Sequence, residues 1–203
     1  MNDNRQQESN KTFAIWNFGC KVNQEEGGAL ASLFAAQGWQ LAGAGESPAL
    51  IGINTCTVTH VSDKKARAVI RRASRRNPLA TIVVTGCLAQ AAPQQIKAIP
   101  GVSLVVDNRS KNRIPQLIEG SISKADAADN ETIQPVLYSH RHERTRAFIK
   151  IQDGCHSFCS YCIVPYTRGA VRSKKPEHVK DELSRLVELG YREIVLTGIH
   201  SGL

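Results

Sequence analysis

The chain has 203 residues, of which 26 are Lys or Arg and 18 are Asp or Glu, so its formal net charge is +8. Apolar residues make up 41% of the sequence and charged residues 22%, a balance that supports a buried core and excludes general disorder. No run of about 18 apolar residues occurs, so no membrane-spanning helix is predicted, and the polar start MNDNRQQESN lacks the apolar stretch of a secretory signal. The positive charge favours a polyanionic partner, with nucleic acid as the first candidate, although a merely basic surface is the alternative.

The first 120 residues alternate between apolar runs and segments with helical spacing. Runs without polar alternation are typical of strands that are covered on both faces. Because strands that alternate with helices form βαβ units, the pattern predicts an α/β domain with a parallel sheet over residues 12–120. The elements predicted along it are strands at 12–18, 49–56, 80–87 and 102–107, and helices at 23–37, 61–76, 93–98 and 111–119.

Three further segments complete the predicted organisation. Residues 1–11 form a polar tail that is predicted to be disordered, and residues 121–145, which are small and polar, form a predicted linker. Residues 146–203 supply a single β-loop-α-β unit, which leaves sheet edges unpaired, so we expect a truncated second domain that continues past the C-terminal residue. The elements predicted in this unit are a strand at 147–152, a helix at 176–190 and a strand at 193–199.

Three of the six cysteines share one predicted position, at or just after the carboxyl end of a strand. They are Cys20, Cys56 and Cys87, in the sequences NFGC, INTC and VTGC. In a parallel sheet these ends lie at one edge, where neighbouring strands are about 4.8 Å apart and where α/β folds bind ligands. Three thiolates with one vacancy suit an iron–sulfur cluster. Three separate buried cysteines, or a zinc site completed by His60, are the alternatives.

The other three cysteines lie close together within residues 154–162, which read GCHSFCSYC. Cys155, Cys159 and Cys162 have the spacing Cys-x3-Cys-x2-Cys in a loop that follows a predicted strand. Three thiolates this close can hold three irons of a cubane cluster, and the fourth iron then stays open to a small molecule. A zinc site that recruits His156 is an alternative, although its direct neighbour Cys155 makes joint ligation of one ion awkward. A disulfide would leave one cysteine of the loop unpaired.

This cysteine motif, after the first strand of a β/α unit, resembles that of the radical S-adenosylmethionine (SAM) enzymes. Much more of the chain, about residues 12–119 and 146–203, is similar to one family of them, the methylthiotransferases. The GCKVNQ and LTGIH forms are most similar to the MtaB-type branch, which modifies threonylcarbamoyladenosine in tRNA. Sister branches act on isopentenyladenosine in tRNA or on an aspartate of a ribosomal protein. The segments that carry the resemblance are NFGCKVNQEE, INTCTVT, VVTGCLAQ, IKIQDGCHSFCSYCIVPYTRG, VRSKKPE and EIVLTGIH.

The resemblance implies a fold, a set of cofactors and a reaction. The fold is a Rossmann-like N-terminal domain followed by the first β-α-β unit of a truncated partial β/α barrel. The cofactors are SAM and two [4Fe-4S] clusters, of which one would be held by Cys20, Cys56 and Cys87 and the other by Cys155, Cys159 and Cys162. The reaction is the addition of a methylthio group to C2 of N6-threonylcarbamoyladenosine at position 37 by means of a 5′-deoxyadenosyl radical. Since this chemistry belongs to the cofactors, no catalytic side chain is predicted, and the truncated chain alone is expected to be inactive.

The same resemblance implies the partners and the location. The substrate would be tRNA, bound through its anticodon loop, and an electron donor such as a flavodoxin or a ferredoxin would reduce the SAM-binding cluster. The source of the added sulfur is not indicated, no membrane partner is expected, and the location implied is the cytoplasm. A non-catalytic metal-binding module is the alternative from another functional class, and it would hold zinc in place of iron and sulfide.

Several other residues are expected near the cofactor on the strength of the resemblance. Each also has a plainer structural interpretation, such as an aromatic ring that fills the loop, a solvated arginine or a helix-capping amide. Asn23 and Gln24 would shape the pocket of the first cluster, and Arg172 would meet cofactor or phosphate. The residues expected to contact SAM are Tyr161 beside the adenine, Gly198, Ile199 and His200 beside the methionine amino group, and Arg168 beside cofactor or phosphate.

The predicted helix over residues 61–76 has a run of positive charge that makes phosphate binding plausible. Basic residues near a helix C-terminus also favour the helix dipole, so the run has a structural explanation as well. A second basic stretch, HRHERTR at 140–146, is interpreted as substrate contact or linker. Four histidines are interpreted as surface residues or as partners in local hydrogen bonds: His60, His140, His142 and His178. The basic residues of the helix are Lys64, Lys65, Arg67, Arg71, Arg72, Arg75 and Arg76.

Overall fold

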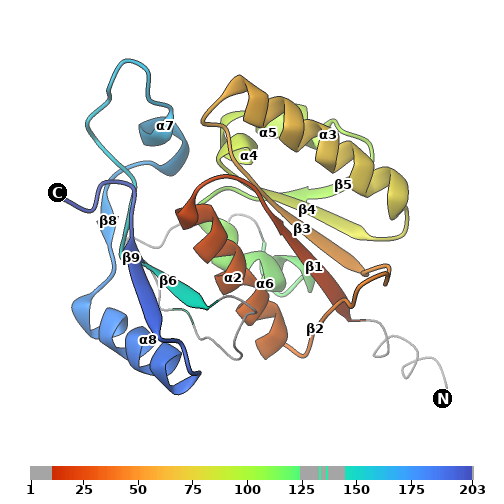
Figure 1. The fold of residues 1–203 in the computed structure, drawn as a ribbon. Helices are drawn as coiled ribbons and strands as arrows, with labels where there is room; N and C mark the ends of the chain where they lie inside the picture. The colour runs from red at the N-terminus through yellow and green to blue at the C-terminus, as the bar shows by residue number, and fades with distance from the viewer. Residues whose placement is uncertain (1–10, 124–132, 134–135, 137–144, 203) are drawn as a thin grey trace.

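The computed structural model describes residues 11–123, 133, 136 and 145–202, and in this part of the chain an α/β unit is followed by a smaller unit (Figure 1). The predicted tail lies outside the described residues, except for its last residue, and so does most of the predicted linker, including His140 and His142. The first unit contains β1 (Thr12–Asn17), α2 (Lys21–Ala36), β2 (Gln40–Leu41), β3 (Leu50–Thr55), α3 (His60–Arg76), β4 (Thr81–Gly86), α4 (Cys87–Ala91), α5 (Pro93–Lys97), β5 (Val102–Val105), the 3-10 helix η2 (Ser110–Arg113) and α6 (Ile114–Ile118).

Within the described residues, the sheet of the first unit has five parallel strands in the order β2-β1-β3-β4-β5. The central strand β3 pairs with β1 through Trp16 and Ile53, and with β4 through Ile53 and Val84. All six residues of β3 are buried, as the uninterrupted apolar run predicts. The chain order of the strands reverses between β1 and β3, so the crevice beyond their carboxyl ends is the position at which open α/β sheets bind ligands.

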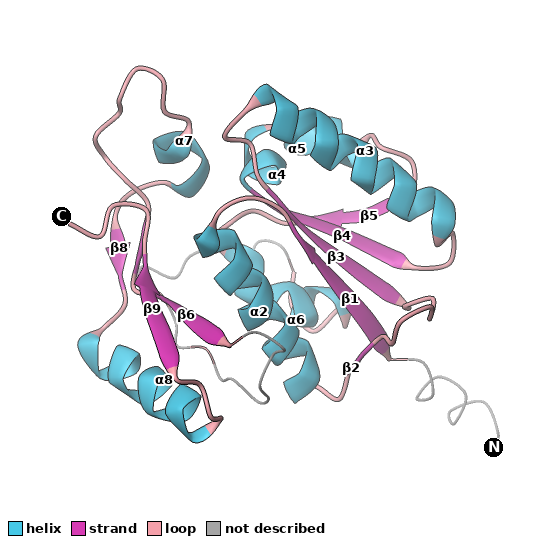
Figure 2. Ribbon diagram, in the orientation of Figure 1, coloured by secondary structure: helices cyan, strands magenta, loops and turns pink. Residues whose placement is uncertain are grey.

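Two apolar cores lie on opposite faces of this sheet, because successive side chains of a strand point in opposite directions. On one face, Ile53 of β3 packs with Ile70 of α3, and α4 and α5 complete the cover. On the other face, Phe13 of β1 packs with Leu30 and Phe34 of α2, and the rings of Phe13 and Phe34 stack with their centroids 5.3 Å apart. Figure 2 shows the resulting layers, with α3 and α2 on opposite sides of the strands.

The second unit is built on two parallel strands and a helix. Ala147 and Ile149 of its first strand form a small core with Leu186 and Tyr191, which come from the helix and the turn after it. No helix in the described part of the chain is long and apolar enough to cross a bilayer. The elements of the unit are β6 (Arg146–Lys150), β7 (Gln152–Asp153), α7 (Val164–Arg168), β8 (Arg172–Ser173), α8 (Pro176–Glu188) and β9 (Glu193–Thr197).

The structure departs from the sequence prediction in its shortest elements. The strand predicted at 147–152 divides into β6 and β7 at Ile151, whose N–H donates to Thr197 O of one sheet while its carbonyl accepts from Lys174 N beside the other. The sequence also did not predict β2, α4, α7 or β8, each of two to five residues. Elements this short do not show the periodic spacing of apolar residues by which a strand or a helix is identified from sequence.

Glycine is required at position 86, where β4 turns into α4. Gly86 has a φ of +96°, and a Cβ built on it would lie 2.2 Å from the carbonyl oxygen of Thr55 on the neighbouring strand. We expect Gly86→Ala to lower the free energy of unfolding by about 3 kcal/mol or more, since a sheet backbone atom cannot rotate away. Gly120→Ala is the matched control, because Gly120 has a φ of +71° and no atom within 4 Å of the added Cβ. Denaturant titration of both variants tests this, and equal losses would contradict the clash.

Candidate metal centres

The structure brings Cys20, Cys56 and Cys87 to the carboxyl edge of the first sheet. Cys20 directly precedes α2, Cys56 follows β3, and Cys87 is the first residue of α4 after β4. Cys56 and Cys87 are buried, whereas Cys20 is exposed, and all three are free thiols. Burial raises the pKa of the Cys56 thiol, and the nearby thiols of Cys87 and Cys20 raise it further, which reflects the proximity of the three sulfurs.

The turn before Cys20 passes closely over Cys56, and glycine makes this approach possible. Gly19 has a φ of +104°, and a Cβ built on it would lie 2.5 Å from Cys56 Cβ and 2.7 Å from Cys56 Sγ. Any larger residue at position 19 would therefore fill the space beside the sulfur. An all-thiolate donor set with this open approach fits an iron–sulfur cluster.

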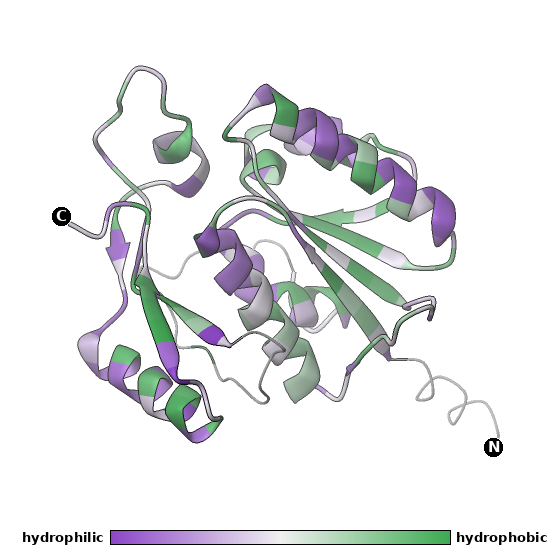
Figure 3. Ribbon diagram, in the orientation of Figure 1, coloured by the Kyte–Doolittle hydropathy of each residue, from purple (hydrophilic) through white to green (hydrophobic). Residues whose placement is uncertain are grey.

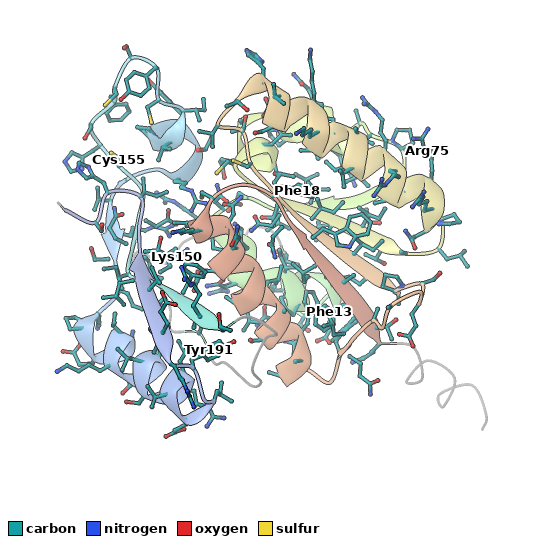
Figure 4. All side chains as sticks on the ribbon, viewed as in Figure 1. Phe13, Phe18, Arg75, Lys150, Cys155 and Tyr191 are labelled. Carbon is teal, nitrogen blue, oxygen red and sulfur yellow. The ribbon has the colours of Figure 1, made fainter. Side chains whose placement is uncertain are left out.

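The second cysteine set lies in the loop between β7 and α7, which Figure 4 shows as a projecting segment around Cys155. Cys155 N–H donates to Gly169 O at 3.1 Å, and Cys162 N–H donates to Cys159 O at 2.9 Å. Hydrogen bonds with Ser157 and with His200 lower the pKa of the Cys155 thiol to about 7. A thiol of this pKa supplies the thiolate that metals bind.

Neither cysteine set is arranged around a single ion. Among residues 11–123, 133, 136 and 145–202, no three His, Cys, Asp or Glu side chains are placed to hold one metal ion. The same holds for each cysteine set with or without His60 or His156. Each set retains three thiols, and that donor chemistry suits a cubane whose irons each take one thiolate.

Gln152, which the sequence analysis did not select, fastens the second cysteine loop to the residues expected near SAM. Its buried amide accepts from the N–H of Ile199 at 2.9 Å and of His200 at 2.8 Å. The same amide donates to Gly154 O at 2.8 Å, directly before Cys155. His200 Nδ1 then lies 3.9 Å from Cys155 Sγ. The segment Gly198–His200, which was predicted to lie near SAM, is therefore beside the loop. Gln152 could have been found in the sequence as an amide residue next to the end of a buried strand.

The other residues selected from the sequence have different surroundings. Tyr161 is 90% exposed. Arg168 is only 2% exposed, and it pairs with Glu26 and Asp153 at 2.9 Å each, so its guanidinium is not the solvated group that the alternative interpretation expected. Arg172 also pairs with Asp153, at 3.3 Å. A pocket of about 360 Å³ opens beside Arg168 and is lined from both units by Gln90, Asp107, Arg109, Ser110, Tyr166, Thr167, Arg168 and Gly169.

Comparison with known proteins assigns the two units separately. Residues 12–107 match the model of the Uncharacterized protein family UPF0004, and residues 149–202 match that of the Radical SAM superfamily. The chain is 43% identical, over 94% of its length, to the threonylcarbamoyladenosine tRNA methylthiotransferase MtaB of Bacillus subtilis. It is 38% identical, over 94% of its length, to the tRNA-2-methylthio-N(6)-dimethylallyladenosine synthase of Novosphingobium aromaticivorans. It covers 44% of each of these two relatives, and so spans less than half of their length.

The chain is similar to radical SAM methylthiotransferases along most of its length, with the UPF0004 match on the first unit and the Radical SAM match on the second. Its fold is similar to that of the radical SAM methyltransferase TsrM from Kitasatospora setae, solved with tryptophan and a SAM analogue, with a TM-score of 0.62 and 15% identity. That likeness covers 93% of this chain and 47% of TsrM, and it confirms the predicted α/β architecture.

Carboxylates and cations gather between the two units of the chain, where Figure 4 shows Lys150 between β6 and α2. Glu26 of α2 is bonded by Lys111, Lys150 and Arg168. Burial alone would raise the pKa of Glu26, but the three cations outweigh burial and hold it well below its ordinary range. Burial likewise opposes ionisation of Asp153, and Lys150 and Arg168 lower its pKa. Both carboxylates are therefore charged inside the protein.

Glu25, the neighbour of Glu26, behaves in the opposite way, because burial raises its pKa to about 7 even though Lys150 and Lys174 oppose the shift. A carboxyl whose pKa is higher in the folded state contributes stability that is complete below about pH 4.5 and is lost as the pH rises to about 7. The glutamine of Glu25→Gln does not titrate. The free energy of unfolding of this variant, relative to that of the native chain, should therefore rise by about 2–3 kcal/mol between pH 5 and pH 8. Urea titration of both proteins at the two pH values measures this, and an identical difference at both would contradict it.

Proposed function

We propose that the protein containing this chain is a tRNA methylthiotransferase that adds a methylthio group to C2 of N6-threonylcarbamoyladenosine at position 37, in the anticodon loop. The observation that carries the proposal is the pair of cysteine trios. One lies at a sheet edge and the other in a loop fastened to Gly198–His200, and the chain as a whole is 43% identical to a relative named for this activity. A cytoplasmic location and an electron donor such as a flavodoxin or ferredoxin follow from the same proposal.

In this function the six cysteines would hold two [4Fe-4S] clusters. When bound, the clusters and SAM supply the radical that activates the C2–H bond and the sulfur that is transferred. The chain's own residues hold and shape the sites. The Cys155 thiol, with its pKa of about 7, ionises readily for ligation, and Gln152 fixes the backbone N–H groups of Ile199 and His200 beside the loop. Burial of Cys56 and Cys87 limits the access of water to the first set.

Helix α3 supports a nucleic acid as the substrate. Its apolar row, which includes Ile70, packs on the sheet, while six of its seven basic side chains are exposed and Arg67 is half-buried. Figure 3 shows this hydrophilic outer face, and Figure 4 shows Arg75 directed away from the sheet. Within the described residues no ion pair joins these cations to a carboxylate, although like charges three or four residues apart destabilise a helix. A phosphate backbone would supply the missing negative charge, and α3 begins four residues after Cys56.

Replacing a cysteine of the second set tests the reaction. In the protein expressed from its complete gene and reconstituted without oxygen, we expect about eight irons, and about four after Cys155→Ala. Methylthiolation of tRNA should be lost in that variant and kept in Ser160→Ala, a control in the same exposed loop. Iron analysis and nucleoside analysis of tRNA give the two readouts. Stoichiometric zinc in a colourless, air-stable protein would instead identify a metal-binding module.

Nucleoside analysis also identifies the substrate. The similarity to a dimethylallyladenosine-modifying synthase makes isopentenyladenosine the second candidate, and an aspartate of a ribosomal protein the third. Loss of the gene should remove the methylthio group from threonylcarbamoyladenosine and leave it on isopentenyladenosine. The reverse pattern would assign the protein to the sister branch.

Removing charge from α3 tests the RNA surface. A variant that lacks four of these charges should bind tRNA more weakly; it carries Arg71→Gln, Arg72→Gln, Arg75→Gln and Arg76→Gln. The slope of its log Kd against log salt concentration should fall by about 0.7–0.9 for each phosphate that the protein no longer neutralises. A control variant removes exposed charge from the second unit and should leave the slope unchanged; it carries Lys175→Gln, Lys180→Gln and Arg192→Gln. Binding titrations between about 50 and 200 mM salt would decide, and equal slopes in both variants would assign α3 no role in RNA binding.

A further inference from the structure

We propose that Asn23 and Arg168 are positioning residues that hold the two cysteine sets in one fixed relation to each other. The proposal rests on the proposed function, because only a reaction that uses both sets needs their separation to be fixed. Asn23 belongs to α2 of the first unit and Arg168 ends α7 of the second, 145 residues further along the chain. Arg168 Nη2 donates to Asn23 Oδ1, and this contact directly joins the hydrogen-bonded groups of the two units, which Glu26 also links.

On the first unit, Asn23 ties together two of the backbone segments that lead to cysteines. Its Nδ2 donates to Phe18 O at 2.8 Å and to Thr55 O at 2.9 Å. Those carbonyls lie two residues before Cys20 and one residue before Cys56. The Asn23 side chain is fully buried, and Asn54 Nδ2 also bonds its backbone carbonyl at 2.8 Å. With both amide hydrogens and the amide oxygen engaged, Asn23 cannot turn without breaking a buried hydrogen bond.

On the second unit, Arg168 is tied to the start of the other cysteine loop. Its Nη1 donates to Asp153 Oδ1 at 2.9 Å, and the same oxygen accepts from Gly154 N at 2.9 Å, directly before Cys155. Directly after α7, the residue that follows Arg168 accepts from Cys155 N–H through its carbonyl, Gly169 O. A shift of Arg168 would therefore move the start of the loop that carries Cys155.

The third cysteine of the first set is connected to the same helix. Asn108 Nδ2 donates to Thr167 O at 2.7 Å and lies 3.9 Å from Cys87 Sγ. Since Thr167 directly precedes Arg168, two consecutive residues of α7 are linked through Asn23 to the carbonyls before Cys20 and Cys56, and through Asn108 to the thiol of Cys87.

Directional contacts of this kind fix a relation that apolar packing leaves adjustable. The fork of a guanidinium holds Glu26, Asp153 and Asn23 at set angles, and lysine in its place could not contact all three in the same plane. A buried ion pair adds little net stability once its desolvation is counted, whereas a gain in structural specificity is a recognised role of such groups. The arrangement therefore favours positioning over stabilisation.

The test uses Asn23→Ala and the conservative Arg168→Lys, with Lys174→Arg as the matched control. Lys174 forms an equally buried ion pair with Glu182, at 2.6 Å, and both residues of this pair belong to the second unit. In the reconstituted complete protein, we expect both positioning variants to keep native iron content, tRNA KM and 5′-deoxyadenosine formation, while kcat for methylthiolation falls at least about tenfold. The control should keep all four values.

Hydrogen exchange of the metal-free protein gives a readout that does not depend on activity. Asn23→Ala should speed exchange of the amides of Gly154 and Cys155 on the opposite unit, and Lys174→Arg should not. If methylthiolation and 5′-deoxyadenosine formation fall together with iron content, or if exchange changes only around the substituted residue, the positioning role is wrong. If the native protein itself never modifies tRNA, the proposed function fails, and the exchange result still decides whether the two units are coupled.

Discussion

A buried arginine joins the two units of this chain, and the placement of both cysteine sets depends on it. Arg168 contacts Glu26 and Asn23 on one side and Asp153 on the other, and less than a fiftieth of its side chain reaches solvent. A buried charge is tolerated only where opposite charges and hydrogen bonds replace water. Lys111 and Lys150 also face Glu26, so the cluster stays ionised and its bonds remain the strong, directional kind.

The two cysteine sets are held by different structural means. The first set uses the ends of parallel strands, where the sheet register brings residues distant in sequence together, and Gly19 leaves space beside Cys56 Sγ. The second set sits in a loop without regular structure, so its position comes from hydrogen bonds made by Gln152 and Gly169. The pocket beside Arg168 is lined by residues of both units.

The long, buried elements could be predicted from the sequence, and the polar contacts between the units could not. The observed ends of strand β3 and helix α3 differ by at most one residue from the predicted ends, because continuous apolar runs and helix-capping residues are local signals. Helix α7 was missed, since five residues with a proline near the start have no measurable period. Gln152 and Glu26 were missed for another reason. A buried polar residue has the same sequence signal as an exposed one until its partners, here up to 142 residues away, are known. Arg168 was selected, but as a contact of cofactor or phosphate, because its carboxylate partners belong to distant segments.

The unequal exposure of the first cysteine set has a consequence for damage by oxygen. Cys56 and Cys87 are shielded by the protein core, whereas Cys20 stands at the surface at the start of α2. Exposed thiolates are the first to pass through sulfenic acid to the sulfinic and sulfonic acids that cellular reductants do not repair. Within the first set, oxidation of the metal-free protein in air would therefore begin at Cys20 and would remove one thiol of that set for good.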